Sequence, residues 1–321
     1  MTLKESYLRH IMSVRRYSPR TAEIYSDVID RFAEFACEGD SSDDALVKAL
    51  TPQTMRSYEV FLMDEKKVSP RTVSQHLSVM SGFCRFLMQN GRLSSNPVRL
   101  VSRPKVSKRL PEVLRPETVS KYLSDTASYA TPEGLSTILG RDATSLSVWT
   151  SCRDRLVIHI LYDTGLRRAE LISLRRNQFD SSRQVLHVLG KGGKMREIPL
   201  LPSLCEEILL YLHATDVVGI APGGGDSPLL VTAKGGSLYP MAVERIVRQA
   251  FAGTVGKKSP HVLRHSLATA LLDEGTGLNA IKELLGHSSL AATQVDTHNS
   301  VEKLRQTYRA AHPRAGRDKN E

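Results

Sequence analysis

Five basic residues in the second half of the chain are of the types that handle a phosphodiester: Arg167, Lys191, His261, Arg264 and His287. Guanidinium groups pair with the non-bridging oxygens of a phosphate and stabilise the charge of a pentacoordinate transition state. A lysine on a turn can protonate a departing oxygen, and a histidine can move the proton of a nucleophile. Together, these residues predict phosphoryl-transfer chemistry that needs no metal ion.

Two helices are predicted to carry the arginines. Gly165 interrupts an apolar helical pattern, so we expect Arg167 at the start of the following helix. Glu170 lies three residues later and can pair with an arginine and hold it. His261 and Arg264 follow a Ser-Pro helix start, and their spacing of three places them on one face of that helix.

A turn and a helix end are predicted to carry Lys191 and His287. Residues 190–193 (Gly-Lys-Gly-Gly) separate two strand-like runs at 185–189 and 197–200, a pattern typical of a hairpin. The glycines beside Lys191 have no side chains, so another backbone could approach this turn closely. His287 follows a glycine, the residue type that most often ends a helix.

Neither a metal nor another cofactor is expected. His261 and His265 have the spacing of two ligands on one helix, but the glutamate of the H-E-x-x-H zinc motif is absent and no third ligand is evident. The four cysteines form no C-x-x-C pair, which argues against zinc and against a disulfide framework. No nucleotide-binding loop of the G-x-x-x-x-G-K-[ST] type occurs.

Residues 1 to about 100 are predicted to be all-helical. The tetrapeptide Ser-Pro-Arg-Thr occurs at 18–21 and at 69–72, and an apolar stripe with helical spacing follows each copy. Arg20 and Arg71 therefore fall in first helical turns, where backbone amides and the helix dipole favour anions. Both are candidate phosphate contacts, although two well-capped helices with solvated arginines would give the same pattern.

A basic segment that contains prolines is expected to link two domains. It includes Lys105, Lys108 and Arg109, which would add phosphate contacts beside a nucleic acid. We predict a helical domain over 1–101, the linker over 102–112 and a second domain over 113–321.

The second domain is predicted to be mainly helical with a small antiparallel sheet. A helix is expected to start near Pro116. Residues 128–151, rich in Ser, Thr and Gly, are expected to form a surface excursion before an apolar helix at 154–163. The hairpin around Lys191 follows, and residues 203–213 are expected to form another helix.

The net charge of the chain and the length of its apolar runs indicate which classes of protein it could belong to. Lys and Arg number 44 against 34 Asp and Glu, which gives a formal charge of +10, and both halves of the chain are basic. This charge suits a polyanionic partner, although many soluble proteins are mildly basic. No apolar run is long enough to span a membrane and no secretory signal is recognisable, so a cytoplasmic location is the simplest expectation.

Four segments together resemble the active-site boxes of tyrosine site-specific recombinases, the phage-integrase and Xer-type family. They are T-G-L-R-x-x-E-L from residue 164, G-K-G-x-K-x-R from 190, H-x-L-R-H-S-x-A-T from 261 and L-G-H-S-S from 285. Their order matches the family, and the resemblance covers essentially the whole chain. It implies a mainly α fold, with an N-terminal helical DNA-binding domain and a C-terminal catalytic domain of helices and a small antiparallel sheet.

The resemblance also implies a role for each candidate residue. Arg167 and Arg264 would hold the scissile phosphate, and Lys191 would be the general acid for the leaving 5′-hydroxyl. His261 would assist the proton transfer of the nucleophile, and His287 would hydrogen-bond the phosphate. The implied partner is double-stranded DNA. Four copies would join two DNA sites through a Holliday junction, with the C-terminal helix around 304–308 docked onto a neighbour.

One position departs from the family pattern. Residues 284–298 are similar to the segment that carries the nucleophilic tyrosine, but Asp296 stands where the pattern has that tyrosine. Its side chain is shorter than a phenol and brings a negative charge toward a phosphate. Tyr308 matches a tail tyrosine of the family and not the nucleophile.

The intact boxes and the changed residue together predict a recombinase that binds DNA without cutting it. An engineered change and a naturally degenerate copy are both consistent with Asp296. One alternative is a non-enzymatic DNA-binding regulator on the same scaffold, and another is an unrelated helical protein that binds phosphate.

Overall fold

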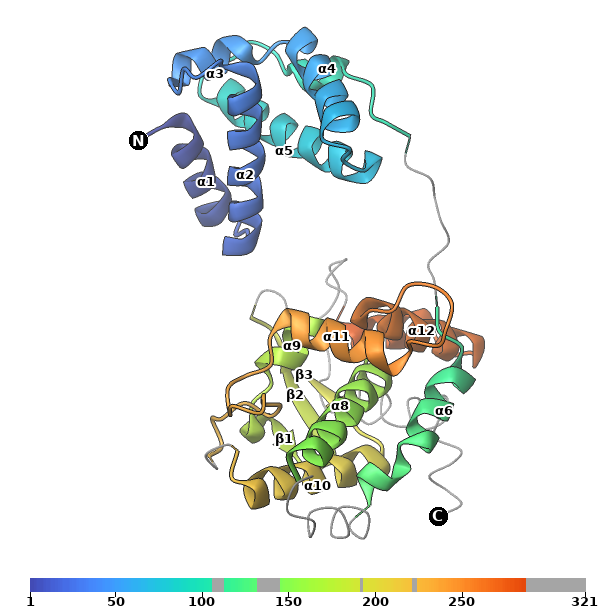
Figure 1. Cartoon of the computed structure of the whole chain (residues 1–321). Helices are drawn as coiled ribbons and strands as arrows, with labels where there is room; N and C mark the ends of the chain where they lie inside the picture. Colours follow the sequence, from blue (N-terminus) through green and yellow to red (C-terminus); the bar gives the residue numbers. More distant parts are fainter. Residues whose placement is uncertain (106–112, 132–144, 191–192, 221–223, 287–321) are drawn as a thin grey trace. The chain divides into compact units, whose positions relative to one another are not determined.

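A computed structural model describes residues 1–105, 113–131, 145–190, 193–220 and 224–286. The chain divides into two units, Met1–Arg109 and Leu110–Glu321, each with its own apolar core (Figure 1). The division falls inside the basic segment 102–112. None of the described helices is long and apolar enough to cross a membrane.

The N-terminal unit is all-helical over its described residues, which confirms the prediction. Its elements are α1 (Leu3–Ser13), α2 (Pro19–Ala36), α3 (Asp43–Ala49), α4 (Pro52–Val60), the π-helical turn η1 (Phe61–Glu65), α5 (Pro70–Gln89) and the 3-10 turn η2 (Pro97–Leu100).

Both Ser-Pro-Arg-Thr copies begin helices as predicted. The side chains of Ser18 and Ser69 accept hydrogen bonds from the backbone of the residue three positions later, each at 3.2 Å, and a proline opens each helix. A side-chain cap of this kind satisfies one of the free amides of the first turn. The predicted stripe of α5, which includes Val73, Leu77 and Met80, is fully buried.

The C-terminal unit places helices around a small sheet. Strands β1 (Phe179–Asp180), β2 (Val185–Leu189) and β3 (Met195–Pro199) pair antiparallel in the order β1-β2-β3, which confirms the predicted hairpin and adds the short strand β1. The remaining elements are α6 (Pro116–Asp125), η3 (Ala127–Ala130), α8 (Ser145–Thr164), α9 (Arg168–Ser173), η4 (Arg176–Gln178), α10 (Pro202–Val218), α11 (Pro240–Ala250), α12 (Pro260–Asp273) and α13 (Leu278–Leu285).

Helix α8 lies at the centre of this unit, in contact with α6, α10, α11 and α12 (Figure 1). It begins at Ser145, so the predicted surface excursion over 128–151 is wrong for its last residues. The reason is Trp149, which is fully buried against Tyr211 and donates from Nε1 to the hydroxyl of Thr215 at 2.9 Å. One large aromatic residue thus anchors a stretch whose other residues are typical of loops.

A buried row of charges links α8 to α10. Arg155 and His159 on α8 both contact the Glu207 carboxylate on α10, and the Nε2 of His159 lies 3.0 Å from Asp163. Burial pushes the pKa of Glu207 upward, but His159 and Arg155 hold it below its usual range. The row follows one face of α8 and ends at Asp163, two residues before the Gly165 turn.

Replacement of Glu207 by Gln is expected to lower the free energy of unfolding by about 3 kcal/mol, because it leaves Arg155 buried without a counter-charge. Urea unfolding followed by the fluorescence of Trp149 reports on this unit. Because the folded pKa of Glu207 is lowered, its contribution is present above the ordinary pKa of a glutamate and is lost as the pH falls.

The matched control is Glu206→Gln, since Glu206 is the exposed neighbour on the same helix. This control should change the free energy of unfolding by no more than about 0.5 kcal/mol. Equal losses in the two variants at neutral pH would contradict a structural role for the buried charges.

Candidate active site

The turn between α8 and α9 places the first arginine of the site. Helix α8 ends at Thr164, Gly165 takes φ +62°, and Arg167 is the residue that caps α9. A Cβ on Gly165 would lie 2.5 Å from the side chain of Leu285 and 3.1 Å from that of Leu267. Only glycine fits both the left-handed backbone and this close contact with α12 and α13. The prediction that this glycine breaks the helix and presents Arg167 is confirmed.

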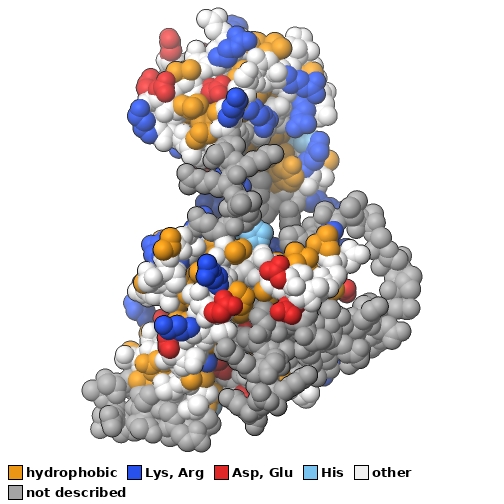
Figure 2. Space-filling model, turned by 90° about the vertical axis from the view of Figure 1, so that its right-hand side faces the viewer, with side chains coloured by type: hydrophobic (Ala, Val, Ile, Leu, Met, Phe, Trp, Pro, Cys, Tyr) orange, Lys and Arg blue, Asp and Glu red, His pale blue; other side chains and the backbone are white. Residues whose placement is uncertain are grey.

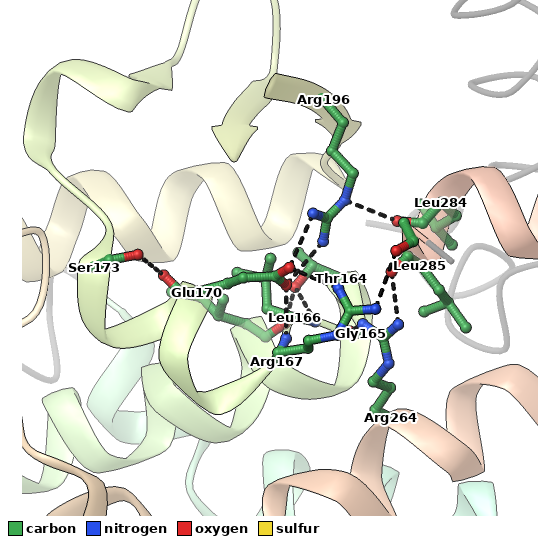
Figure 3. A network of polar contacts seen from close by, with 12 residues as sticks. Thr164, Gly165, Leu166, Arg167, Glu170, Ser173, Arg196, Arg264, Leu284 and Leu285 are labelled. Carbon is green, nitrogen blue, oxygen red and sulfur yellow. Dashed lines mark hydrogen bonds and ion pairs between the residues drawn. The ribbon is translucent and has the colours of Figure 1, made fainter. Parts of the chain in front are cut away.

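Glu170 holds two arginines together (Figure 3). Its carboxylate accepts from the backbone N–H of Arg167 at 2.9 Å and from the Nη1 of that residue at 2.8 Å. On its other side it accepts from both terminal nitrogens of Arg196, at 3.1 and 2.9 Å. Burial of this carboxyl raises its pKa, but the hydrogen bonds from Arg196 and Arg167 outweigh that effect and leave the pKa below its usual range. Glu170 is therefore a carboxylate.

The C-terminal end of α13 is the second anchor of the arginines. The carbonyls of Leu284, Leu285 and Gly286 accept from Arg196 at 3.3 Å, from Arg264 at 2.6 Å and from Arg167 at 3.0 Å, respectively. The last carbonyls of a helix have no partner within the helix and carry partial negative charge. Each of these three carbonyls is thus satisfied by a different guanidinium.

The cluster carries more positive than negative charge. In the described part of the chain, three guanidinium groups, those of Arg167, Arg196 and Arg264, surround one carboxylate, that of Glu170. Arg264 is only 7% exposed, and burial together with the neighbouring Arg167 and Arg196 lowers its pKa to about 10, against the opposing pull of Glu170. An added anion would relieve this repulsion. The side chain of Arg167 is 31% exposed, so an anion can reach it from solvent.

His261 lies at the edge of the arginine cluster. It is exposed on the first turn of α12, three residues before the buried Arg264. With Arg264 and His265 it lines a groove of about 380 Å³ between α12 and α13, whose other walls are largely apolar. The structure therefore brings His261 close to Arg264, as the spacing predicted. Among the residues described, no group of three His, Cys, Asp or Glu side chains is arranged to hold a metal ion.

The remaining predicted catalytic residues, Lys191, His287 and Asp296, lie outside the described residues. For two of them, Lys191 and His287, the structure describes the residue directly before. In the hairpin, the N–H of Gly190 donates to the carbonyl of Lys194 at 2.8 Å. Gly286, directly before His287, ends α13 in a left-handed conformation.

Arg196 is a residue of the site to which sequence reasoning assigned no role. It lies on β3, five residues after Lys191, and it joins the hairpin to both α9 and α13. Its place in the G-K-G-x-K-x-R box was the available signal. The pairing with Glu170 could not be read from the box, because the two residues are 26 positions apart.

The predicted DNA contacts of the N-terminal unit and the linker are exposed where the structure describes them. Arg20 and Arg71 lie in the first turns of α2 and α5, and Lys105 is also exposed. Arg20 pairs with Glu23 at 2.8 Å on the surface, so its charge is partly offset locally. Lys108 and Arg109 lie outside the described residues.

Comparison with known families agrees with the layout of the site. The model of the phage integrase family matches residues 131–303, and that of the phage integrase N-terminal SAM-like domain matches residues 5–90. This chain belongs to the phage integrase family. Its members are tyrosine recombinases, so the resemblance seen in the four boxes is confirmed.

Two relatives of this integrase-family protein illustrate the similarity, and each aligns along almost its whole length. The tyrosine recombinase XerC of Chlorobaculum parvum (strain DSM 263 / NCIMB 8327) is 32% identical, over 97% of this chain and 94% of the relative. The XerC of Alcanivorax borkumensis is 34% identical, over 98% and 95%.

Solved structures show the same fold. The XerH site-specific recombinase in a post-cleavage complex with palindromic difH substrate gives a TM-score of 0.64 at 21% identity, over 94% of this chain and 83% of that chain. The Tn1549 transposon integrase in complex with circular intermediate DNA gives 0.57 at 18% identity, over 94% and 98%. The predicted fold class, mainly α with a small antiparallel sheet, is confirmed.

Replacement of Gly286 by Ala in this integrase-family protein is expected to lower the free energy of unfolding by about 2 kcal/mol or more. Gly286 has φ +63°, and a Cβ there would lie 3.1 Å from the Cζ of Arg196. Gly219→Ala is the matched control, because Gly219 ends α10 with φ +68° and a Cβ there would meet nothing within 4 Å. The control measures the backbone cost alone, about 1 kcal/mol.

A double-mutant cycle with Arg196→Ala completes the measurement. The excess cost of Gly286→Ala over Gly219→Ala should vanish once the guanidinium is gone. An excess that persists in the Arg196→Ala background would show that Arg196 is not what crowds the end of α13.

Proposed function

We propose that this chain is a site-specific DNA recombinase whose phosphate site is intact and whose nucleophile position holds Asp296. The observation that carries the proposal is the convergence of Arg167, Arg264 and Arg196 around one carboxylate, which leaves surplus positive charge beside solvent. Family membership supports the same function. The DNA complexes of the XerH and Tn1549 proteins support double-stranded DNA as the partner.

In this proposal Arg167 and Arg264 bind the non-bridging oxygens of the scissile phosphate and stabilise the charge that builds up on them. Lys191 donates a proton to the leaving 5′-oxygen. His261 takes the proton of the nucleophile, and His287 donates a hydrogen bond to the phosphate. With a tyrosine at position 296, a 3′-phosphotyrosyl bond would form as the bond to the 5′-oxygen breaks, and the energy of the phosphodiester would be kept for rejoining.

Asp296 stops this sequence at its first step. A carboxylate reaches less far than a phenol and repels the phosphate, so the chain would bind DNA without cleaving it. We further propose that it assembles as the resemblance implies: four copies on two DNA sites around a Holliday junction, with the C-terminal helix around 304–308 exchanged between neighbours. A non-enzymatic DNA-binding regulator is the second candidate function, and Asp296 itself is the observation that favours it.

Restoration of the nucleophile tests the proposal. Asp296→Tyr is expected to form a covalent adduct with a nicked suicide substrate that contains the binding site of the chain, selected beforehand from random-sequence duplexes. Denaturing electrophoresis of end-labelled DNA would show the shifted band and establish that the link is to the 3′-phosphate. The unaltered chain should show no such band.

Two control variants isolate the contribution of the hydroxyl at position 296. Asp296→Phe restores the ring without a hydroxyl and should give no adduct, whereas Tyr308→Phe combined with Asp296→Tyr should give it in full. If Asp296→Tyr binds its site and yields no covalent product, the recombinase proposal fails and the regulator stands.

The salt dependence of binding tests whether phosphate contacts dominate. On a duplex of arbitrary sequence, affinity measured by fluorescence anisotropy should fall by about 10³-fold or more between about 50 and 200 mM salt, because each bound phosphate releases counterions. The +10 charge, spread over both halves, is the reason for this expectation. A DNA affinity that hardly changes with salt concentration would argue against binding through contacts between basic residues and phosphates.

A further inference from the structure

The N-terminal unit has a basic site of its own, in a small pocket. The pocket lies between α1, α2 and α5 and has a volume of about 100 Å³. Tyrosine and basic side chains form much of its wall; they are Tyr7, His10, Arg15, Tyr17, Tyr25 and Arg85. We call it the tyrosine–arginine pocket.

The wall of this pocket is rich in hydrogen-bond donors. Among the described residues that line it, none is acidic. The rings of Tyr7, Tyr17 and Tyr25 meet there, with centroids 6.3 Å apart for Tyr7 and Tyr25 and 5.8 Å apart for Tyr17 and Tyr25. Arg15 and Arg85 are exposed beside them. Three hydroxyls, two guanidinium groups and an imidazole suit an anion with several oxygens.

The tyrosine hydroxyls stay protonated and can donate. Burial raises the pKa of Tyr7 above its ordinary value, and the neighbouring Tyr25 and Tyr17 raise it further, against the opposing pull of Arg85 and Arg15. The pKa of Tyr25 is raised in the same direction, by burial first and by Tyr17 second. Both side chains are therefore neutral donors at neutral pH, and the guanidinium groups supply the positive charge.

Helix α5 is shaped to admit the Tyr7 hydroxyl. Gly82 lies in the middle of this helix, where a glycine costs up to about 1 kcal/mol relative to alanine. A Cβ at Gly82 would lie 2.6 Å from the Tyr7 hydroxyl oxygen. The glycine thus lets a buried tyrosine bring its hydroxyl to the wall of the pocket instead of ending in the core.

A third arginine reaches the rim of the pocket from the linker side. Arg103 donates to the hydroxyl of Ser78 at 2.9 Å, and Ser78 lines the pocket. Figure 2 shows one face of the N-terminal unit, on which Lys and Arg side chains gather. The pocket therefore lies in a unit whose surface already attracts polyanions.

We propose that the tyrosine–arginine pocket binds one backbone phosphate of a DNA duplex. Its volume is well below the roughly 300 Å³ at which small-molecule pockets begin, so it suits a phosphate group and not a whole nucleotide. Hydroxyl and guanidinium donors are the groups that contact DNA phosphates and fix the register of a protein on the duplex. The inference rests on the proposed function, since it needs the chain to bind DNA.

The test compares two arginines that carry the same charge. Arg85→Met removes the charge from the pocket, whereas Arg92→Met removes it from a surface pair with Asp44 that does not line the pocket. Binding of the full chain to a duplex is measured over a range of salt concentrations. Arg85→Met should weaken binding about tenfold and reduce the slope of log affinity against log salt by about one. Arg92→Met should stay within about twofold of the unaltered chain.

A second variant separates hydrogen bonding from charge. Tyr7→Phe removes a donor and no charge, so affinity should fall severalfold while the salt slope stays unchanged. Thermal unfolding of every variant verifies that the unit is folded. Equal effects of Arg85→Met and Arg92→Met, or no effect of Tyr7→Phe, would overturn the proposal.

Titration with inorganic phosphate alone, followed by the tyrosine ring signals in NMR spectra, distinguishes the sources of the phosphate. Shifts of Tyr7 and Tyr25 that disappear in Arg85→Met, together with an unchanged salt slope on DNA, would mean that the pocket takes a free anion and would overturn the DNA assignment. If the unaltered chain binds no duplex at all, the proposed function fails as well, and the phosphate titration then reports on the pocket by itself.

Discussion

The described active-site cluster depends on the buried carboxylate of Glu170. It accepts hydrogen bonds from the backbone and side chain of Arg167 on one side and from the fork of Arg196 on the other. One residue thereby joins the start of α9 to the hairpin strand β3. Without it, the three guanidinium groups would face one another with no negatively charged side chain between them among the described residues, and their repulsion would push them apart. In the proposed function, the geometry of the phosphate site is therefore set by Glu170, which need not touch the phosphate.

The end of α13 acts as a second and weaker counter-charge. Three successive carbonyls receive three arginines, so the partial negative charge of the helix end offsets part of the surplus. A phosphate oxygen carries more charge than a carbonyl and would be the stronger partner. The end of α13 thus neutralises only part of the positive charge of the three arginines. The same contacts fix the position of Gly286, the last residue of this region that the structure describes.

Local chemistry was readable from the sequence, and long-range packing was not. Serine caps, the Gly165 turn and the hairpin follow from short patterns, and the structure confirms each of them. The pairing of Arg196 with Glu170 depends on how β3 packs beside α9, which no local pattern reports. The start of α8 was missed because a single residue, Trp149, outweighs the loop-like composition around it. The tyrosine–arginine pocket forms only where three helices meet. The catalytic roles of all the predicted site residues are proposals that rest on the resemblance; they are Arg167, Lys191, His261, Arg264, His287 and Asp296.

In the proposed function, phosphate recognition and nucleophilic attack depend on different residues of this chain. The described cluster obtains its charge from α9, β3 and α12, and each of its arginines is held by contacts that do not involve position 296. A tyrosine is neutral at neutral pH and an aspartate is ionised, so the residue at 296 changes the net charge of +10 by a single unit. The attraction for a polyanion is a sum over many phosphate contacts, so one unit of charge at a position that makes no such contact would leave most of the attraction in place. In the proposed function, loss of the tyrosine hydroxyl would remove the covalent step completely. Under this proposal, an aspartate in place of the tyrosine matters little for DNA binding and is decisive for cleavage.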